Sequence, residues 1–228
     1  MRELARIFLK LPREACVLDI GCFGFQLVRE TREIGPEFRH FGVDFTDYDQ
    51  VPEGFTYRKA DLNCEGLPYD DDSMDIVVAN HIMEHLKSPI DFVSECIRVC
   101  KPGAFIFIST PSERSLFLPG MPFAFEKFHS SSFFDDPTHL GRPWTPQSLF
   151  RLAKYLQCEP LMAAHSISWK ARLAFPILVP YAILTRDARL LEQLIWGAVG
   201  WTSFVVIQKP ADLCGAPRFS YYIPSRNH

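Results

Sequence analysis

The sequence predicts an α/β domain built on a doubly wound, mostly parallel sheet of seven strands, with a helical insert before the last strand. Short apolar runs alternate with segments of helical spacing through residue 109. The apolar run at residues 15–20 breaks at Gly21 and then turns amphipathic, as a strand, a glycine turn and a helix would. Two further strand-like runs follow near the end of the chain. This order favours parallel strands joined by right-handed crossovers.

The first half of the chain supplies five of the strands. Apolar residues at helical spacing over 2–11 predict a lead-in helix that ends at Pro12. A second helix is expected at 24–33. A third is expected at 88–99, where Ser88 and Pro89 suit a helix start and Lys101-Pro102-Gly103 suits a stop. The strands are expected at residues 15–20, 38–45, 55–62, 74–79 and 104–109.

The second half departs from this simple alternation. Residues 112–144 form a long, phenylalanine-rich segment without a sustained period, and we expect an aromatic lid loop there. Thr145 and Pro146 then begin a helix that runs to about Leu156. The last two strands are expected at 160–168 and 201–208. Between them lies a strongly apolar insert at 169–200, and a proline-rich tail follows from residue 210.

Composition limits the function classes. With 228 residues, 47% of them hydrophobic, the chain is expected to form one domain over 1–228. It has 24 Lys and Arg against 27 Asp and Glu, a net charge of −3, and no basic block, so nucleic acid is not an expected partner. The seven cysteines form no C-x-x-C pair and residues 1–4 lack a signal-peptide core, which predicts a cytoplasmic protein with reduced thiols.

Two acidic residues at strand ends predict a nucleotide-type cofactor site. Asp19 lies at the end of the first strand, where it can meet a cation, and the glycine turn after it lets backbone amides approach a ligand. Asp44 follows 25 residues later at the end of the second strand. An acidic residue near that offset accepts hydrogen bonds from ribose hydroxyls in dinucleotide- and nucleoside-binding folds.

Three stretches carry a family resemblance. Asp19-Ile20-Gly21-Cys22-Phe23-Gly24, the Leu67-Pro68 to Glu84-His85-Leu86 block and Ile108-Ser109-Thr110-Pro111 together resemble the class I S-adenosylmethionine-dependent methyltransferases, in their small-molecule branch, over roughly residues 15–165. The resemblance implies a Rossmann-like fold with S-adenosyl-L-methionine as cofactor. Carried onto this chain, it implies cofactor contacts from Asp19, Gly21, Cys22, Gly24, Asp44, Phe45, Asp61, Leu62, Asn80 and His81.

Phe23 and Phe25 depart from that family pattern, because glycines usually occupy their positions. Backbone amides make most contacts in such loops, and any residue that reaches the required φ and ψ supplies them. The alternative reading is a binding or scaffold protein that keeps the fold and has lost the cofactor.

A zinc site is the competing interpretation of residues 81–85, whose His81-x-x-Glu84-His85 order matches the inverted zincin signature. That signature needs a long helix, yet His81 directly follows a buried strand and only residues 84–87 precede Ser88-Pro89. No metal site is therefore predicted. Glu84 and His85 either brace the turn after the strand or take part in catalysis.

The segment Asp136-Pro137-Thr138-His139 resembles one that lies above the methyl donor in many of these enzymes. Methyl transfer to oxygen is helped by a base near the acceptor hydroxyl, and histidine titrates in the right range. His139 is therefore the predicted catalytic residue, and His129 is a second candidate. The alternative is that His139 and Arg142 fasten the lid by hydrogen bonds.

The insert at 169–200 is predicted to form a helical cap. Residues 173–184 are uncharged but too few to span a bilayer, which needs about 20, and they include Pro176 and Pro180. Residues 186–199 have the pattern of an amphipathic helix. The apolar surface packs on the domain, on a second copy of the chain, on a membrane surface or on a lipid-like acceptor. The predicted reaction is methyl transfer to an oxygen of a small-molecule, saccharide or lipid-linked acceptor.

Overall fold

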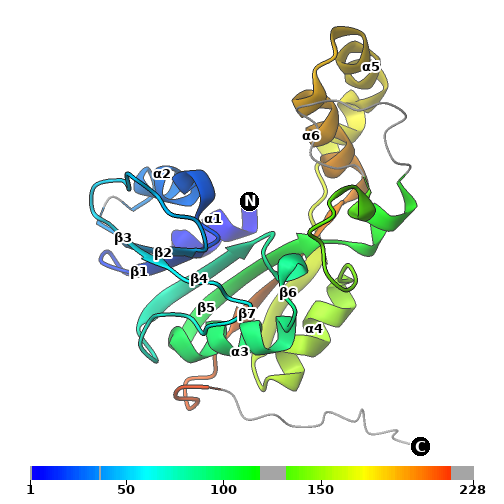
Figure 1. Cartoon of the computed structure of the whole chain (residues 1–228). Helices are drawn as coiled ribbons and strands as arrows, with labels where there is room; N and C mark the ends of the chain where they lie inside the picture. The colour runs from blue at the N-terminus through cyan, green and yellow to red at the C-terminus, as the bar shows by residue number, and fades with distance from the viewer. Residues whose placement is uncertain (1, 36, 119–131, 217–228) are drawn as a thin grey trace, which may run out of the picture.

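The computed structural model describes residues 2–35, 37–118 and 132–216, and in them it shows a seven-stranded sheet with helices on both faces (Figure 1). The strand order is β3-β2-β1-β4-β5-β7-β6, with β7 antiparallel to both of its neighbours and the other pairs parallel. This confirms the predicted fold class. The strands are β1 (Cys16–Ile20), β2 (Arg39–Asp44), β3 (Phe55–Lys59), β4 (Met74–Asn80), β5 (Cys100–Pro111), β6 (Glu159–His165) and β7 (Thr202–Gln208).

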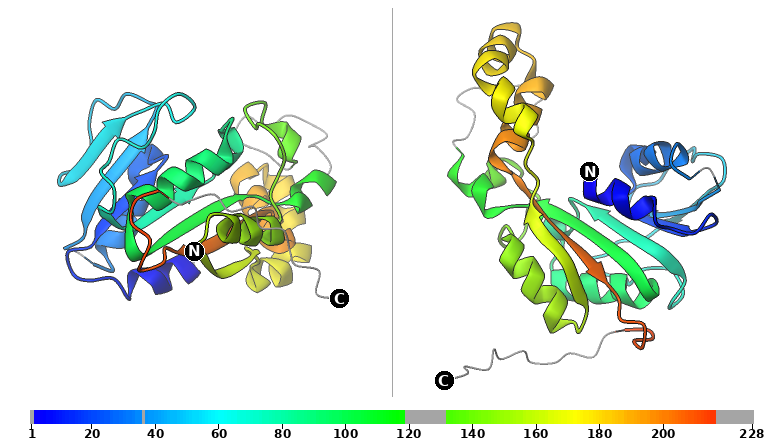
Figure 2. Two further views of the ribbon diagram at one scale, coloured as in Figure 1. Left: turned by 90° about the horizontal axis from the view of Figure 1, so that it is seen from below. Right: turned by 180° about the vertical axis from the view of Figure 1, so that it is seen from behind.

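Helices and short 3-10 turns connect these strands. The α-helices are α1 (Arg2–Phe8), α2 (Gln26–Arg32), α3 (Pro89–Val99), α4 (Pro146–Tyr155), α5 (Trp169–Thr185) and α6 (Ala188–Val199). The 3-10 turns are η1 (Phe23–Phe25), η2 (Met83–His85), η3 (Glu113–Phe117) and η4 (Phe133–Asp135). Helices α1 and α2 lie on one face of the sheet, and α3 and α4 lie on the other (Figure 2).

The core has two halves because successive side chains of a strand point to opposite faces. Val17 and Ile76 pack on the side of α1, whereas Leu18 and Val77 pack on the side of α3 and α4. All four side chains are buried. Strands covered on both faces read as continuous apolar runs, which is why β1 and β4 stand out in the sequence.

The order in which strands are added to the sheet reverses at β1, which pairs in parallel with β2 on one side and with β4 on the other. Ile20 is in register with both Val43 and Ala79. The next residues, Gly21, Asp44 and Asn80, therefore lie together at the carboxyl edge of the sheet. Such a switch point is where open α/β sheets bind ligands.

Local conformation shifts several predicted boundaries. The helix expected at 24–33 begins only at Gln26, because Gly24 (φ 66°) and Phe25 (φ 52°) take left-handed conformations that end η1. Strand β5 starts at Cys100 and not at residue 104, and an irregular register opposite Met74 accommodates the extra residues. Strand β2 is one residue shorter at each end than the predicted strand at 38–45. Strand β3 begins at residue 55, as predicted for the strand at 55–62, but it already ends at Lys59.

Helices α5 and α6 pack against each other as a hairpin that projects away from the sheet (Figures 1 and 2). Pro176 and Pro180 both lie inside α5, which continues through them. Each proline leaves the carbonyl four residues earlier without a helix donor. Those carbonyls belong to exposed positions, Arg172 and Pro176, where water can reach them. No helix in the described ranges is long and apolar enough to cross a bilayer.

Part of the predicted aromatic lid is described. Its later portion docks on the sheet edge, where Leu140 N–H donates to Glu84 O (2.7 Å) and Trp144 N–H donates to Pro111 O (3.1 Å). Phe133 is buried, whereas Phe117 and Phe134 are exposed. The remaining lid phenylalanines, Phe123, Phe125 and Phe128, lie outside the described residues, as does His129.

A buried lysine joins the end of β7 to the segments that precede β4 and β5. The Lys209 ammonium is fully buried and donates to Asp72 Oδ1 (2.6 Å), Ile97 O (2.8 Å) and Cys100 O (2.8 Å). A fourth bond runs to Gly215 O (2.9 Å). A buried ammonium with this many acceptors is costly to remove, because its partners are left without their donor.

We therefore expect Lys209→Met to lower the free energy of unfolding by about 3 kcal/mol. Lys101→Met is the matched control, because the Lys101–Asp75 pair is partly exposed and such pairs contribute less than about 1 kcal/mol. Urea denaturation followed by circular dichroism measures both values. Equal losses in the two variants would contradict this account of Lys209.

Candidate functional site

Two adjoining cavities lie at the carboxyl edge of the sheet. The first, of about 750 Å³, is bordered by the ends of β2 and β3 and by the turn after β4. The second, of about 570 Å³, is bordered by the ends of β1, β4 and β7. Gly21, Phe23 and His81 line both cavities, so the two cavities adjoin, and together they are called the cleft below. Its size suits a cofactor with an adjoining acceptor.

The turn after β1 has room only for glycine at its first position. Gly21 has φ 72°, and a Cβ there would lie 2.0 Å from Ile82 Cδ1. Phe25 takes a left-handed conformation and packs its ring against Tyr48 and Phe55, with centroids 4.9 and 5.2 Å away. Phe23 is 80% exposed at the rim of the cleft. The two phenylalanines therefore leave the turn intact.

Carboxylates from three successive strand ends face the cleft. Asp44 is buried, and it accepts hydrogen bonds from Thr46 N (3.0 Å) and Tyr48 OH (3.2 Å). Asp61 lines the first cavity and Asp19 lines the second. Each carboxylate oxygen accepts more than one hydrogen bond, so Asp44 keeps capacity for a ligand.

Asp19 is strongly perturbed by its surroundings. Burial raises the pKa of its carboxyl to about 7, and the negative charges of Asp44 and Glu30 add to the effect. A cation bound in the second cavity would oppose all three causes. The cleft thus favours a positively charged ligand group next to Asp19.

The turn after β4 supplies the other wall. His81 has φ 55°, donates its N–H to Ser109 O (2.9 Å) and lies beside the Trp196 ring, 5.9 Å away. Asn80 accepts a hydrogen bond from Ser109 Oγ (2.9 Å). Trp196 comes from α6, so the base of the hairpin forms part of the second cavity. Sequence spacing gave no signal for this contact.

Most residues predicted to contact the cofactor line the cleft. Cys22 and Gly24 line neither cavity, and the buried Cys22 side chain packs with Val28 and Phe55. Further lining residues that the sequence analysis did not name are Gln26, Thr46, Asn63, Gln193 and Trp196. The predicted residues that line the cleft are Asp19, Gly21, Asp44, Phe45, Asp61, Leu62, Asn80 and His81.

His139 lies beside the cleft and not in its lining. Its Nδ1 is 2.7 Å from Phe133 O, and its ring packs on the rings of Phe133 and His85 at 4.5 and 5.0 Å. His85 and Thr138 line the first cavity next to it. His139 therefore reaches the cleft only across these neighbours.

Comparison with known proteins agrees with this geometry. A family model described as a methyltransferase domain matches residues 1–161. A probable S-adenosylmethionine-dependent methyltransferase of Mycolicibacterium smegmatis is 33% identical over 120 residues, 50% of this chain and 44% of its own length. A ubiquinone biosynthesis O-methyltransferase of Roseobacter denitrificans is 25% identical over 175 residues, 69% of this chain and 67% of its own.

The match to the first of these relatives spans less than half of that protein's length. Among solved structures, an S-adenosylmethionine-dependent methyltransferase from Archaeoglobus fulgidus superposes with a TM-score of 0.60, covering 91% of this chain and 90% of the other at 22% identity. One from Mesorhizobium loti gives 0.62, covering 92% and 98% at 15% identity. These likenesses show the same fold.

The fold and the cleft define an α/β protein of the methyltransferase type. The chain belongs to the methyltransferase domain family, within the class I S-adenosylmethionine-dependent superfamily. The cofactor of that superfamily is S-adenosyl-L-methionine. The residues present fit it, because a glycine-only turn and two acidic strand ends adjoin a cavity large enough for a nucleoside.

The raised pKa of Asp19 predicts a pH dependence of stability. The folded chain holds this proton with a pKa of about 7 against 3.8 for the ordinary carboxyl. Stability from this group is therefore present below about pH 4 and is lost as the pH rises towards 7. Between pH 5 and 8, the ligand-free protein should lose roughly 2 to 3 kcal/mol more stability than Asp19→Asn. Urea denaturation at each pH tests this, and parallel curves for the two proteins would refute it.

Proposed function

We propose that this protein transfers a methyl group from S-adenosyl-L-methionine to an oxygen of a small-molecule, saccharide or lipid-linked acceptor. The observation that supports this most directly is the cleft, in which the carboxylates of Asp44 and Asp61 line one cavity, that of Asp19 lines the other, and the glycine-only turn borders both. Two relatives, named as O-methyltransferases for ubiquinone biosynthesis and for a malonyl acyl-carrier protein, are consistent with an oxygen acceptor.

The cofactor supplies an electrophilic methyl group on a sulfonium. Asp44 would accept hydrogen bonds from the ribose hydroxyls and Asp61 from the adenine, while Asp19 faces the positively charged end. The second cavity, with Trp196 at its wall, leaves space for the acceptor beside that end. Alignment of the two reactants provides most of the acceleration in such a displacement, and a group that prepares the acceptor hydroxyl assists. We assign that second role to His139, which would act on an acceptor hydroxyl that extends from the second cavity towards His85 and Thr138 in the first.

Cofactor affinity gives the main test. Replacing Asp44 with Ala should remove charge-assisted bonds worth roughly 1.5 to 3 kcal/mol, so affinity for S-adenosyl-L-methionine and its demethylated product should fall about ten- to a hundredfold. Titration calorimetry on the parent and on Asp44→Ala measures this. The control is Asp47→Ala, because Asp47 is an exposed neighbour paired with Lys59 outside the cleft.

The same titration separates enzyme from non-catalytic scaffold. Phe23 at the rim of the cleft is the feature that favours a scaffold, since it stands where glycine is usual in this superfamily. A parent protein that binds neither compound would support the scaffold and contradict the methyltransferase.

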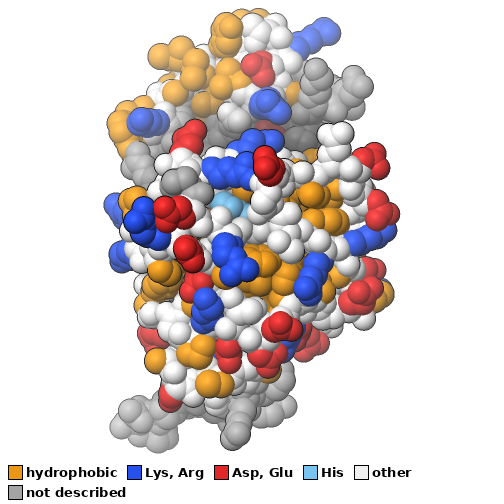
Figure 3. Space-filling view, turned by 90° about the vertical axis from the view of Figure 1, so that its left-hand side faces the viewer, with side chains coloured by type: hydrophobic (Ala, Val, Ile, Leu, Met, Phe, Trp, Pro, Cys, Tyr) orange, Lys and Arg blue, Asp and Glu red, His pale blue; other side chains and the backbone are white. Residues whose placement is uncertain are grey.

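The hairpin favours the lipid-linked class of acceptor. On α5 the side chains of Leu173 (69%), Ile177 (73%) and Leu184 (84%) are exposed, and hydrophobic side chains gather over the hairpin in Figure 3. The apolar side of α6 faces inward, with Leu191 and Leu194 buried, so α5 presents the outer surface. Large exposed apolar surfaces mark interaction sites.

Charge points to an anionic surface as the partner. The hairpin, residues 169–199, contains four Lys or Arg against one Asp and one Glu, whereas the chain as a whole has a net charge of −3. Apolar side chains beside basic residues suit the headgroup region of an anionic bilayer. We therefore propose that the hairpin contacts a membrane surface, with its base at the acceptor cavity.

Vesicle flotation tests the membrane contact. The parent should float with vesicles containing phosphatidylglycerol and less with phosphatidylcholine alone, and the triple variant Leu173→Ser, Ile177→Ser, Leu184→Ser should stay in solution. Leu9→Ser is the matched control, since Leu9 is 74% exposed outside the hairpin. A parent that does not float but forms a dimer by light scattering, which the triple variant abolishes, would assign the surface to a second copy of the chain.

A further inference from the structure

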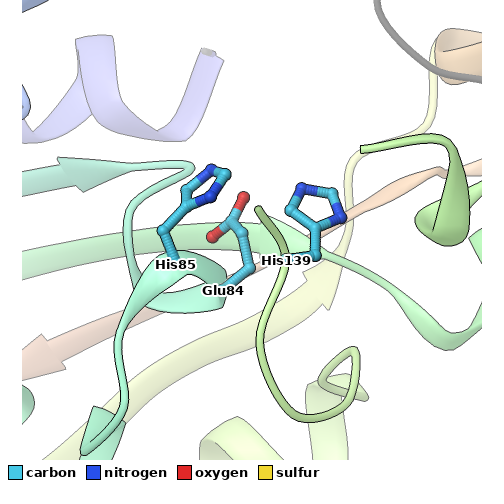
Figure 4. Close-up of side chains that lie close together, drawn as sticks. All are labelled: Glu84, His85 and His139. Atoms are coloured by element: carbon cyan, nitrogen blue, oxygen red, sulfur yellow. The ribbon is translucent and has the colours of Figure 1, made fainter. Parts of the chain in front are cut away.

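Three side chains that offer metal ligands meet beside the first cavity. Glu84 and His85 come from η2, and His139 comes from the lid segment after η4. One potential ligand atom from each lies within 4.8 Å of the others. Figure 4 shows the polar ends of the three side chains close together, although two separate segments carry them.

In each of the two histidine rings, His85 and His139, one nitrogen is a hydrogen-bond donor and the other keeps its lone pair. His139 Nδ1 faces the Phe133 carbonyl (2.7 Å), which only accepts, so Nδ1 carries the proton. His85 Nδ1 faces Thr138 O (3.4 Å) and Thr138 Oγ1 (3.0 Å), and the hydroxyl donates its own hydrogen to Asp136 Oδ1 (2.6 Å). In both rings the lone pair is therefore on Nε2. Metal-binding histidines are oriented in this way, with the other nitrogen donating to a fixed acceptor.

Glu84 is a buried carboxylate whose hydrogen bonding is incomplete. Its side chain is 1% exposed, and Oε1 lies 3.1 Å from His81 Nδ1. Oε2 is buried and has no hydrogen-bond partner among the described residues. A buried polar atom without a partner is costly, and a cation is one group that satisfies a carboxylate oxygen.

We propose that Glu84, His85 and His139 bind a divalent transition cation of the Zn²⁺ class. Two imidazole nitrogens and one carboxylate oxygen are a set that catalytic zinc sites use, with a fourth position open. Ligand atoms around tetrahedral zinc lie about 3.3 Å apart, so the side chains close together slightly on loading. This ligand set differs from the one that the H-x-x-E-H signature of residues 81–85 implies. His139, from a separate segment, is one of its ligands, so the ligands need not lie on one long helix.

The position of the cluster gives the cation a role. His85 lines the first cavity, so the cluster borders the cleft. This role rests on the proposed function: the cation would bind the acceptor hydroxyl and lower its pKa, and water would take up the proton as the methyl group is transferred. In the loaded site His139 would act as a ligand and not as a base. The cation would also join the lid to η2, adding to the bond from Leu140 N–H to Glu84 O.

An ion pair is the competing explanation for His139. Its Nε2 lies 3.7 Å from Asp136 Oδ2. Burial raises the pKa of Asp136, but hydrogen bonds from Thr138 and the nearby His139 and His85 lower it overall. A protonated His139 paired with Asp136 would not bind a cation. That ion pair would also leave the buried Glu84 Oε2 without a hydrogen-bond partner among the described residues.

Zinc titration of the metal-stripped protein tests the proposal without any acceptor. The protein carries Cys64→Ser and Cys214→Ser, so that these two exposed thiols do not compete for zinc. We expect one Zn²⁺ per chain, with affinity reduced about a hundredfold in Glu84→Gln and in His139→Ala. Glu113→Gln is the matched control, since Glu113 pairs with His165 in a separate cluster and should leave zinc binding unchanged.

The outcomes separate the site from the reaction. Absence of stoichiometric zinc binding, or binding that Glu84→Gln and His139→Ala leave unchanged in chains that fold by circular dichroism, overturns the metal site. If Glu84→Gln fails to fold, His139→Ala and His85→Ala decide. Calorimetry with S-adenosyl-L-methionine runs in parallel: zinc binding without cofactor binding keeps the site and refutes the methyltransferase, while the reverse refutes the site alone.

Discussion

The close approach of the backbone at Gly21 is the constraint on which the rest of the site depends. Its N–H donates to Val43 O (2.8 Å), and Ile82 occupies the space that a side chain would need. Three segments, the turn after β1, the end of β2 and the turn after β4, are thereby held against one another. The cleft forms between them, so its shape follows from the pairing of β1 with both neighbours.

The buried carboxyl of Asp19 lowers the stability of the fold when it is ionised. Asp19 is buried near Asp44 and Glu30, and a carboxylate in that position is destabilised by desolvation and by like charges. A sequence selected for stability alone would place a neutral side chain at the end of β1. Local conflicts of this kind concentrate at functional sites, where the ligand supplies the missing compensation.

Features set by neighbouring residues could be predicted from the sequence. The apolar run of β1, the placement of Asp44 at the end of β2 and the start of α4 at Pro146 depend on local spacing, and each appears within a residue of its expected place. The contact between His139 and His85 could not be predicted, because more than fifty residues separate them and only the docking of the lid joins them. The continuity of α5 could not be predicted, because a proline removes a helix hydrogen bond and crowds the preceding turn, and the sequence does not show that the freed carbonyls lie at exposed positions.

The way in which the hairpin enters the sheet makes it a separable module. His165 at the end of β6 is paired with Ser203 near the start of β7, and Ser166 N–H donates to Thr202 O (2.7 Å). The two strands thus close on each other before the chain leaves for α5 and after it returns from α6. A segment whose ends are already joined in this way can be exchanged, lengthened or lost without moving the strands that carry the cleft. Where the protein works in the cell and what it acts on can therefore change in evolution independently of the chemistry itself.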